Sequence, residues 1–137
     1  MSEQVASLEQ LRWNRRIMSV QLQTEQMPGY LVARFTGAGV AEDVWRHFDF
    51  IAEHCKRTKN NKLLIDTTRA EGEISLMERF LVAARARVFA YYCITVAFVE
   101  LPERIDPQRF AELVARNREV NARVFSDLRA AEKWLLE

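Results

Sequence analysis

Hydrophobic and polar positions along the chain follow two different periods, and the alternation of these periods predicts a series of strands and helices. Residues Ile17–Glu25 alternate with a period of two, which is typical of a half-buried strand. Tyr30–Thr36 predicts a second strand, and Met27-Pro28-Gly29 between them is a turn signal. We therefore expect the chain to open with an antiparallel hairpin. Compact apolar runs predict three further strands, at Lys62–Asp66, Cys93–Val99 and Arg123–Phe125.

Apolar residues at helical spacing predict four helices between and after these strands. Val40–Lys59 places Val44, Phe48, Ile51, Ala52 and Cys55 on one face. A second helix begins at Ser75, which forms a capping box with Glu78, and runs to about Tyr91. Its predicted core face consists of Met77, Phe80, Leu81, Ala84, Val88 and Tyr91.

Two helices are predicted in the last third of the chain. Asp106-Pro107 reads as an N-cap followed by proline in the first turn, and Asn121 as the end of the helix that follows. Ser126 is the expected cap of the final helix. The first of these helices is expected to face inward through Phe110, Leu113 and Val114. The final helix is expected to face inward through Leu128, Ala131 and Leu135.

The resulting order, ββαβαβαβα, predicts an α/β fold with a mixed, mostly parallel sheet and helices packed on it. We expect an N-terminal arm over residues 1–16 and a single domain over residues 17–137. Cys93–Val99 is nearly all apolar, which is typical of a central strand covered on both faces.

Composition narrows the classes of function. The 137 residues are 49% hydrophobic and 28% charged, with a net charge of +1, so nothing favours nucleic acid as a partner. We expect the two cysteines, Cys55 and Cys93, to be buried thiols in a reducing compartment. The longest apolar run is too short for a transmembrane segment and the N-terminus lacks a secretory core, so the protein is expected to be cytoplasmic.

A second apolar row lies on the predicted Ser75–Tyr91 helix, formed by Val82, Ala86 and Phe89. A helix with two apolar faces has to bury both or lend one to another molecule. Three explanations are open: the N-terminal arm with Trp13 covers the row, a second subunit covers it, or the helix is a lid over an apolar ligand. A homodimer is the first expectation.

Phe50 lies on the polar face of the Val40–Lys59 helix together with Asp43, His47 and His54. The two histidines are seven residues apart, which is about 10 Å along a helix, so one metal ion cannot easily bridge them. The sequence therefore predicts no metal site. An aromatic side chain among polar neighbours makes this face a candidate partner surface or an ordinary solvated face.

Two further groups of residues are candidates for binding. Asp66, Thr67 and Thr68 lie at the C-terminal end of a predicted strand, where ligands often bind in open α/β sheets, although such residues also form local turns that anchor a loop. Basic side chains on and near the second helix suit an anionic group or a solvated surface; they are Arg69, Arg79, Arg85 and Arg87. Nucleotide-binding and nucleophile motifs are missing from the sequence, so we expect neither a cofactor nor an enzyme.

This element order, the strand Leu63-Leu-Ile-Asp66 and the ending Arg123-Val-Phe…Lys133-Trp-Leu resemble the SpoIIAA-like family of the STAS superfamily, which is often described with the SEC14-type lipid-binding fold. The resemblance covers roughly residues 17–136. Regulatory members carry a phosphorylatable serine within a motif like Asp-Ser-Ser-Gly at the start of the helix after the third strand. Ser75 is at that place here, with Ile74 instead of the aspartate and without the glycine.

The resemblance implies three functions. The first is a non-enzymatic regulatory or binding domain that acts through protein–protein contacts. The second is a carrier of a small apolar or lipid ligand beneath a lid helix. The third is an anti-sigma-factor antagonist regulated by phosphorylation of Ser75.

Overall fold

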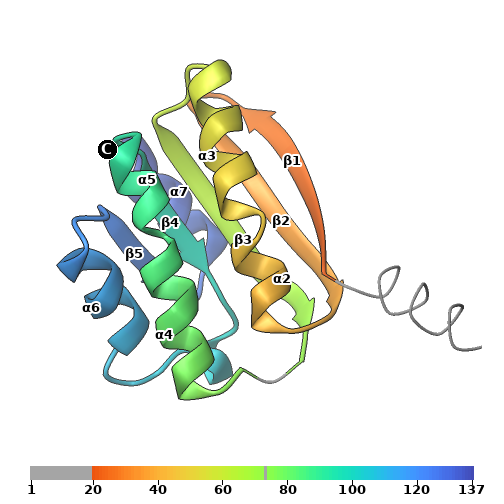
Figure 1. Ribbon diagram of the computed structural model, residues 1–137. Coiled ribbons are helices and arrows are strands. Elements are labelled where there is room, and N and C mark those ends of the chain that lie inside the picture. The colour runs from red at the N-terminus through yellow and green to blue at the C-terminus, as the bar shows by residue number, and fades with distance from the viewer. Residues whose placement is uncertain (1–19, 73) are drawn as a thin grey trace, which may run out of the picture.

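The computed structural model describes residues 20–72 and 74–137, and its centre is a five-stranded sheet (Figure 1). The strands lie side by side in sequence order: β1 (Gln21–Met27), β2 (Tyr30–Ala38), β3 (Lys62–Glu71), β4 (Thr95–Val99) and β5 (Ala122–Phe125). β1 is antiparallel to β2, and all the other neighbours are parallel. The predicted mixed sheet with an opening hairpin is therefore confirmed. The expected arm over residues 1–16, and residues 17–19 of the first predicted strand, lie outside the described residues.

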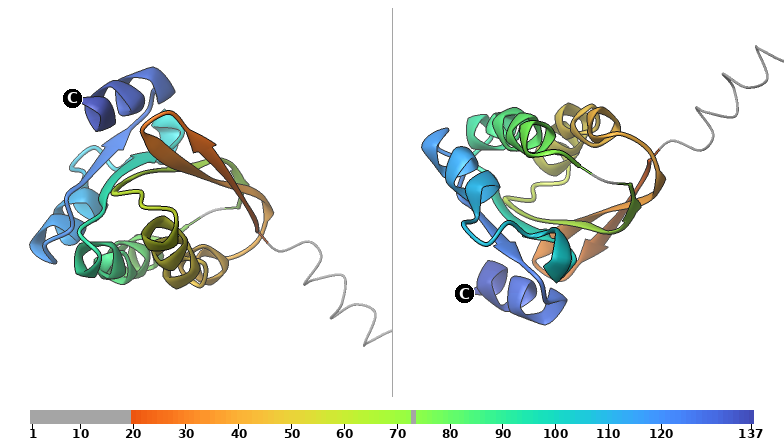
Figure 2. Two further views of the ribbon diagram at one scale, coloured as in Figure 1. Left: turned by 90° about the horizontal axis from the view of Figure 1, so that it is seen from above. Right: turned by 90° about the horizontal axis from the view of Figure 1, so that it is seen from below.

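The helices form two unequal layers. On one face lie α2 (Ala41–Trp45), α3 (Phe48–Arg57), α4 (Leu76–Arg85), α5 (Arg87–Tyr91) and α6 (Phe110–Asn117), as Figure 2 shows. A short 3₁₀ helix, Pro102–Arg104, precedes α6. Successive parallel strands joined by crossovers of the same hand place every connecting helix on the same face. The final helix, α7 (Leu128–Leu136), covers the opposite face alone (Figure 2).

The long helix predicted at Val40–Lys59 forms as two helices with a break at Arg46–His47. Its predicted inward face is nevertheless confirmed, because all five residues are buried: Val44, Phe48, Ile51, Ala52 and Cys55. Burial also raises the pKa of the Cys55 thiol to about 12. Cys93 does not share this environment, because it is exposed in a turn with φ of 56°, so the prediction of a second buried thiol is wrong.

The predicted Ser75–Tyr91 helix also forms as two helices, and the face assigned to the core is correct only in part, because Phe80 and Val88 pack against the core. Met77 and Tyr91, which were expected inside, are 65% and 82% exposed. Ala86 and Phe89 are fully buried instead, and the Phe89 ring packs 5.1 Å from that of Phe48. The inward face therefore runs from Ala83 of α4 across the break to Ala86 and Phe89. The sheet of the same chain buries these two residues, and no second subunit is needed to cover them.

α7 packs through Ala131 and Leu135 on a cluster that includes Val32, Leu64 and Val99. The side chain of Asp127, not Ser126, accepts hydrogen bonds from the first helical amides, at Arg129 and Ala130. Leu128, expected to face inward, is half exposed. The Tyr30 hydroxyl donates a hydrogen bond to the Glu132 carboxylate. Burial and this contact raise the pKa of Tyr30 to about 12.

α6 begins later than the sequence predicts. Asp106 accepts a hydrogen bond from the Phe110 amide at 3.0 Å, but residues 107–108 form a turn, and Arg109 adopts a left-handed conformation with φ of 52°. The first helical residue is therefore Phe110 rather than Pro107. Val114 is buried as expected, whereas Leu113 is 54% exposed, contrary to its predicted inward position.

β3 extends well beyond the predicted Lys62–Asp66, because the polar residues that follow also pair with β2. The register changes from Arg34↔Asp66 to Thr36↔Arg69, so Thr67 and Thr68 together face a single residue of β2. This arrangement is a β-bulge. The Asp66 carboxylate accepts hydrogen bonds from both the amide and the hydroxyl of Thr68, at 2.9 and 2.7 Å. The bulge therefore lets β3 continue to Glu71.

A candidate binding cavity at the carboxyl ends of the strands

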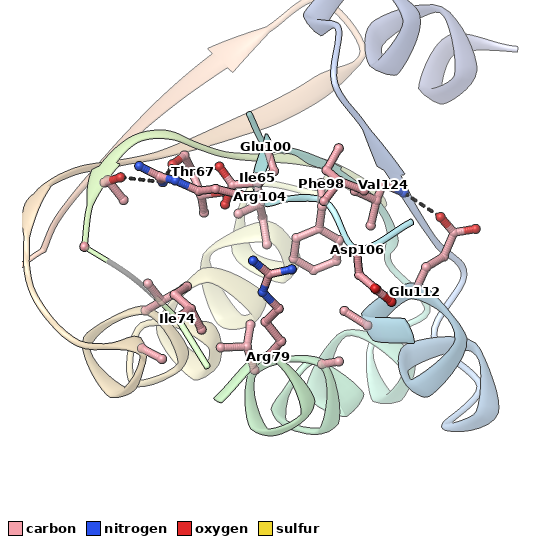
Figure 3. A pocket seen from close by; sticks show the side chains of 18 of the residues that line it. Ile65, Thr67, Ile74, Arg79, Phe98, Glu100, Arg104, Asp106, Glu112 and Val124 are labelled. Carbon is pink, nitrogen blue, oxygen red and sulfur yellow. Dashed lines mark hydrogen bonds and ion pairs between the residues drawn. The ribbon is translucent and has the colours of Figure 1, made fainter. Parts of the chain in front are cut away.

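A cavity of about 660 Å³ lies between the carboxyl ends of the parallel strands and the helices on the same face (Figure 3). α2, α4 and α6 contribute side chains to its wall, as do β3, β4 and β5. Its volume falls within the range of about 300–1,000 Å³ that is typical of small-molecule sites. Ligands of open α/β sheets bind at this edge.

The unequal lengths of the strands create the space. β4 pairs with β3 only as far as Asp66↔Val99, whereas β2 and β3 stay paired as far as Ala38↔Glu71. The two longer strands thus form a ribbon that projects past β4. Ala70, Glu71 and Gly72 at the end of this ribbon line one side of the cavity.

Apolar side chains form much of the wall. Ile65 and Phe98 come from neighbouring strands, and Val82 comes from the middle of α4. Smaller residues of the helices widen the space between them; they are Ala41, Ala83, Ala111 and Ala115. A small ligand with an apolar body therefore finds contacts on both the sheet side and the helix side.

Arg104 fastens the loop after β4 to the projecting ribbon. Its Nη1 donates to the carbonyl oxygen of Ala70 at 2.6 Å and lies 3.4 Å from Oε1 of Glu100. Glu100 also accepts hydrogen bonds from the Leu101 amide at 2.8 Å and from the Thr67 hydroxyl at 2.9 Å. These contacts join the end of β3 to residues 100–104, more than 30 residues later in the chain, and they fix the polar side of the cavity (Figure 3).

The electrostatics of Glu100 reflect this position. Burial raises the pKa of its carboxyl group above the ordinary value of 4.5. The hydrogen bonds from Leu101 and Thr67, and the positive charges of Arg104 and Arg79, oppose that rise. A carboxylate held by so many donors is fixed in place, and its interactions are mainly with the protein.

Glu112 holds a second polar corner of the cavity. Its carboxylate accepts from the Val124 amide at 3.1 Å and forms ion pairs with Arg109 and Arg116. Arg109 in turn donates to the carbonyl oxygen of Val124 at 2.8 Å. These contacts connect α6 to β5. The charges of Glu112, Arg109 and Arg116 therefore stabilise the wall of the cavity.

Arg79 differs from Arg104 and Arg109 in its hydrogen bonding. It lies in the first turn of α4, and its guanidinium group points into the cavity toward the sheet (Figure 3). Within residues 20–72 and 74–137, its side chain forms no hydrogen bond or ion pair. Among the described residues, this cation therefore has no hydrogen-bonding or ion-pair partner, and it acts on Glu100 only through its charge.

The structure separates the residues that the sequence singled out. Val82 lines the cavity and Ala86 and Phe89 lie in the core, whereas Phe50 is 48% exposed on α3 and its ring stacks on His54 at 5.8 Å. Thr67 lines the cavity, and Asp66 and Thr68 stabilise the bulge beside it. The expectation that the strand ends at Asp66 is wrong, because β3 continues to Glu71. The predicted local hydrogen bonds are present between Asp66 and Thr68, whereas the Thr67 hydroxyl donates to Glu100 of another segment.

Ser75 caps α4, as its position in the sequence predicts. Its hydroxyl accepts from the Glu78 amide at 3.1 Å, and the Glu78 carboxylate accepts from the Ser75 amide at 3.1 Å. These bonds to Ser75 lower the pKa of Glu78. The serine is exposed, and its proposed phosphorylation stays a prediction.

The charged residues on and near α2, α3 and α4 do not converge on one site. Asp43 accepts a hydrogen bond from the Val40 amide at 3.1 Å, and the ring of His47 lies against Phe35. In the part of the chain that the structure describes, no group of three or more histidine, cysteine or acidic residues is placed to hold a metal ion. Of the basic side chains, Arg79 lines the cavity, whereas Arg69, Arg85 and Arg87 are exposed and do not line it.

Sequence reasoning missed Glu100 and Arg104, which contribute most of the polar contacts at the projecting ribbon. A charged pair four residues apart directly after an apolar strand is a local signal that could have drawn attention to them. None of the described helices is long and apolar enough to cross a membrane.

Comparisons with known proteins identify the fold. No family model matches the chain, and no curated protein matches it either. Among solved structures, an anti-sigma factor antagonist from Mycobacterium paratuberculosis superposes with a TM-score of 0.57 at 14% sequence identity, over 87% of this chain and 96% of the other. An uncharacterized protein from the DUF3478 family with a SpoIIAA-like fold, from Shewanella loihica PV-4, gives a TM-score of 0.53 at 21% identity, over 85% and 94% of the two chains. The chain therefore has a SpoIIAA-like fold.

Proposed function

We propose that the protein is a non-enzymatic binding domain that takes a small ligand with an apolar body into the cavity at the carboxyl ends of the strands. The observation that carries this proposal is the cavity of about 660 Å³, walled by apolar side chains from both the sheet and the helices. The described residues that line it include no histidine, cysteine or serine, and the hydroxyl of Thr67 is bonded to Glu100, which Arg104 and the Leu101 amide also hold in place. Its charged groups serve mainly to hold the wall together.

In this proposal α4 is the cover of the cavity. It contributes Arg79, Val82 and Ala83 to the wall, and its first turn is held by the Ser75 cap. Leu76 and Met77 at the start of the helix are exposed rather than packed in the core. An outward movement of α4 would thus open the cavity without first breaking the core contacts of Phe89.

Native mass spectrometry of protein purified from cells tests the proposal. We expect a copurified small molecule in the wild type and its loss in Val82→Trp, because the indole would occupy part of the cavity that Val82 lines. Ala130→Trp places the same side chain at an exposed position on α7 and serves as the matched control. Wild-type protein that is repeatedly empty, and that also binds no added amphiphile, contradicts the proposal.

A regulatory role through protein contacts is the second candidate, favoured by the likeness to an anti-sigma factor antagonist. Two exposed residues are available for it: Phe50, a candidate contact with a second copy or another protein, and Ser75, a candidate phosphorylation site. A phosphate on Ser75 would meet the positive end of α4 but also the Glu78 carboxylate, so it would rearrange the cap.

Two measurements address this second candidate. If Phe50 forms a homodimer contact, Phe50→Asp converts a dimer to a monomer in light scattering, whereas Glu53→Gln at an exposed neighbouring position leaves it unchanged. A wild type that is already monomeric contradicts the dimer. Incubation with serine kinases from the same genome is expected to add one phosphate to the wild type but none to Ser75→Ala, and an unchanged wild-type mass counts against the switch.

A further inference from the structure

We infer that the ligand of the cavity is an amphiphile with a single anionic head group, a carboxylate or a phosphate, which pairs with Arg79. This inference rests on the proposed function and goes beyond it by specifying the chemistry of the ligand. Three features carry it: the unpaired guanidinium in the wall, the engagement of the other charged groups with the protein, and the apolar surface next to Arg79.

The first feature is the position of Arg79. Its side chain is half-buried and extends from α4 into the cavity, toward the side where Ile65 and Phe98 lie (Figure 3). It has no hydrogen-bonding or ion-pair partner in residues 20–72 and 74–137. A partly desolvated guanidinium group without a partner is unfavourable, and its planar fork matches a carboxylate or a phosphate.

The second feature is that the other cations of the wall already have partners. Arg104 is bound to the carbonyl oxygen of Ala70 and to Glu100. Arg109 is bound to the carbonyl oxygen of Val124 and to Glu112. The orientation of these two side chains is therefore set by the protein, whereas the guanidinium group of Arg79 has all its donors available.

The acidic residues of the wall are mostly engaged as well, and Glu100 interacts with Arg79 through its charge alone, without a hydrogen bond or an ion pair. Glu100 accepts from Leu101, Thr67 and Arg104, and Glu112 is paired with two arginines. Asp106 accepts from the Phe110 amide. The remaining two, Glu71 and Glu103, are exposed to solvent, where water screens their charge.

The third feature is the apolar surface that continues from Arg79. Val82 and Ala83 follow it along α4, and Ile65 and Phe98 face it from the sheet. A chain attached to the head group would therefore replace water along these side chains. An amphiphile satisfies both parts of the site, whereas a free inorganic anion satisfies only one.

Isothermal titration of the full chain with four ligands that share one alkyl chain tests the inference. The probes are octanoate, octyl phosphate, octanol and octylammonium, with acetate and inorganic phosphate as anions that lack the chain. We expect the two anionic amphiphiles to bind at least about tenfold more tightly than octanol, and octylammonium to bind most weakly. Binding of octanoate but not octyl phosphate, or the reverse, would identify the head group.

Two variants assign the preference to Arg79. Arg79→Met keeps the length of the side chain and removes its charge, and we expect it to weaken octanoate binding by at least about tenfold while octanol binding is retained. Retained octanol binding also shows that the variant is folded. Arg85→Met on the exposed side of the same helix is the matched control, and it is expected to bind octanoate like the wild type.

The outcomes separate the inference from the proposed function. If octanol and octanoate bind the wild type equally, or octylammonium binds best, the anionic head group is wrong while the apolar cavity stands. If acetate or inorganic phosphate binds as tightly as its amphiphile, the alkyl chain is not recognised and the inference also fails. If none of the six probes binds, both the inference and the proposed function are contradicted.

Discussion

The two ends of the main helix layer use the same sheet face in opposite ways. Near the amino ends of the parallel strands, α3 and α5 fill the interior with Phe48, Ile51 and Phe89, all of them almost inaccessible to solvent. Near the carboxyl ends, α2, α4 and α6 leave a cavity of about 660 Å³ with charged groups in its wall. The packed end is suited to stability, and the open end has the space and chemistry for a ligand.

The breaks in the two long helical segments separate these ends. α2 and α3 are distinct helices, as are α4 and α5, so the helices beside the cavity are not continuous with those over the core. The following four predictions test this division, in order of decreasing expected effect.

The largest effect is expected from truncation at the packed end. Phe89→Ala removes a fully buried ring that contacts Phe48, and it should lower the free energy of unfolding by about 3–5 kcal/mol. Val82→Ala shortens a half-buried side chain at the cavity and should lower the free energy of unfolding by about 1 kcal/mol or less. Urea denaturation followed by circular dichroism measures both values, and similar losses in the two variants would contradict the division.

The next effect concerns the polar connection across the cavity. Arg104→Met removes the donor that binds the carbonyl oxygen of Ala70 and Oε1 of Glu100. It should lower the free energy of unfolding by about 1–3 kcal/mol. Arg85→Met at an exposed position should stay within about 0.5 kcal/mol of the wild type in the same denaturation assay. A loss for Arg104→Met no greater than that for Arg85→Met would mean that these bonds do not hold the wall.

A smaller loss is expected at the start of α4. Ser75→Ala removes the acceptor of the Glu78 amide and should reduce the free energy of unfolding by about 1 kcal/mol. Ser126→Ala is the matched control, because Asp127 provides the cap of α7 and little change is expected. Thermal unfolding compares the two, and equal shifts would indicate that the cap of α4 contributes nothing.

The smallest effect is a pH dependence at the cavity end. Because burial raises the pKa of Glu100, the folded chain holds this proton to higher pH than the unfolded chain does. The associated stability is fully present below the ordinary value of 4.5 and is lost as pH rises through the raised value. The wild type should therefore lose stability relative to Glu100→Gln over this window, as measured by denaturation at several pH values, and a constant difference would contradict the assignment.

The sequence predicts the order of the strands and helices well, because apolar residues recur at the period that each element requires. The core face of α3 follows directly from this spacing, and so do the hairpin and the central position of β4. The prediction fails in part for α4 and α5, because their apolar residues form two rows at helical spacing and the spacing alone does not show which row faces inward.

The cavity was harder to predict, because it depends on contacts between distant segments. The polar residues after Asp66 give no apolar signal for a strand, and they become one by pairing with Thr36–Ala38 of β2. Glu100 and Arg104 look like ordinary turn residues until the fold brings Thr67 and Ala70 against them. Val82 and Arg79 were both noted in the sequence, but only the structure places them in one wall.

The bulge at Thr67–Thr68 also has an evolutionary consequence. It acts as a one-residue insertion that is absorbed where it occurs, because Arg69 and Ala70 beyond it are again paired one to one with β2. A related chain that lacks one of these threonines could form an uninterrupted ladder with Ala70 still facing the cavity. Alignments of divergent relatives should therefore allow a gap at this point of β3, since an ungapped alignment would exchange the two faces of the strand beyond it.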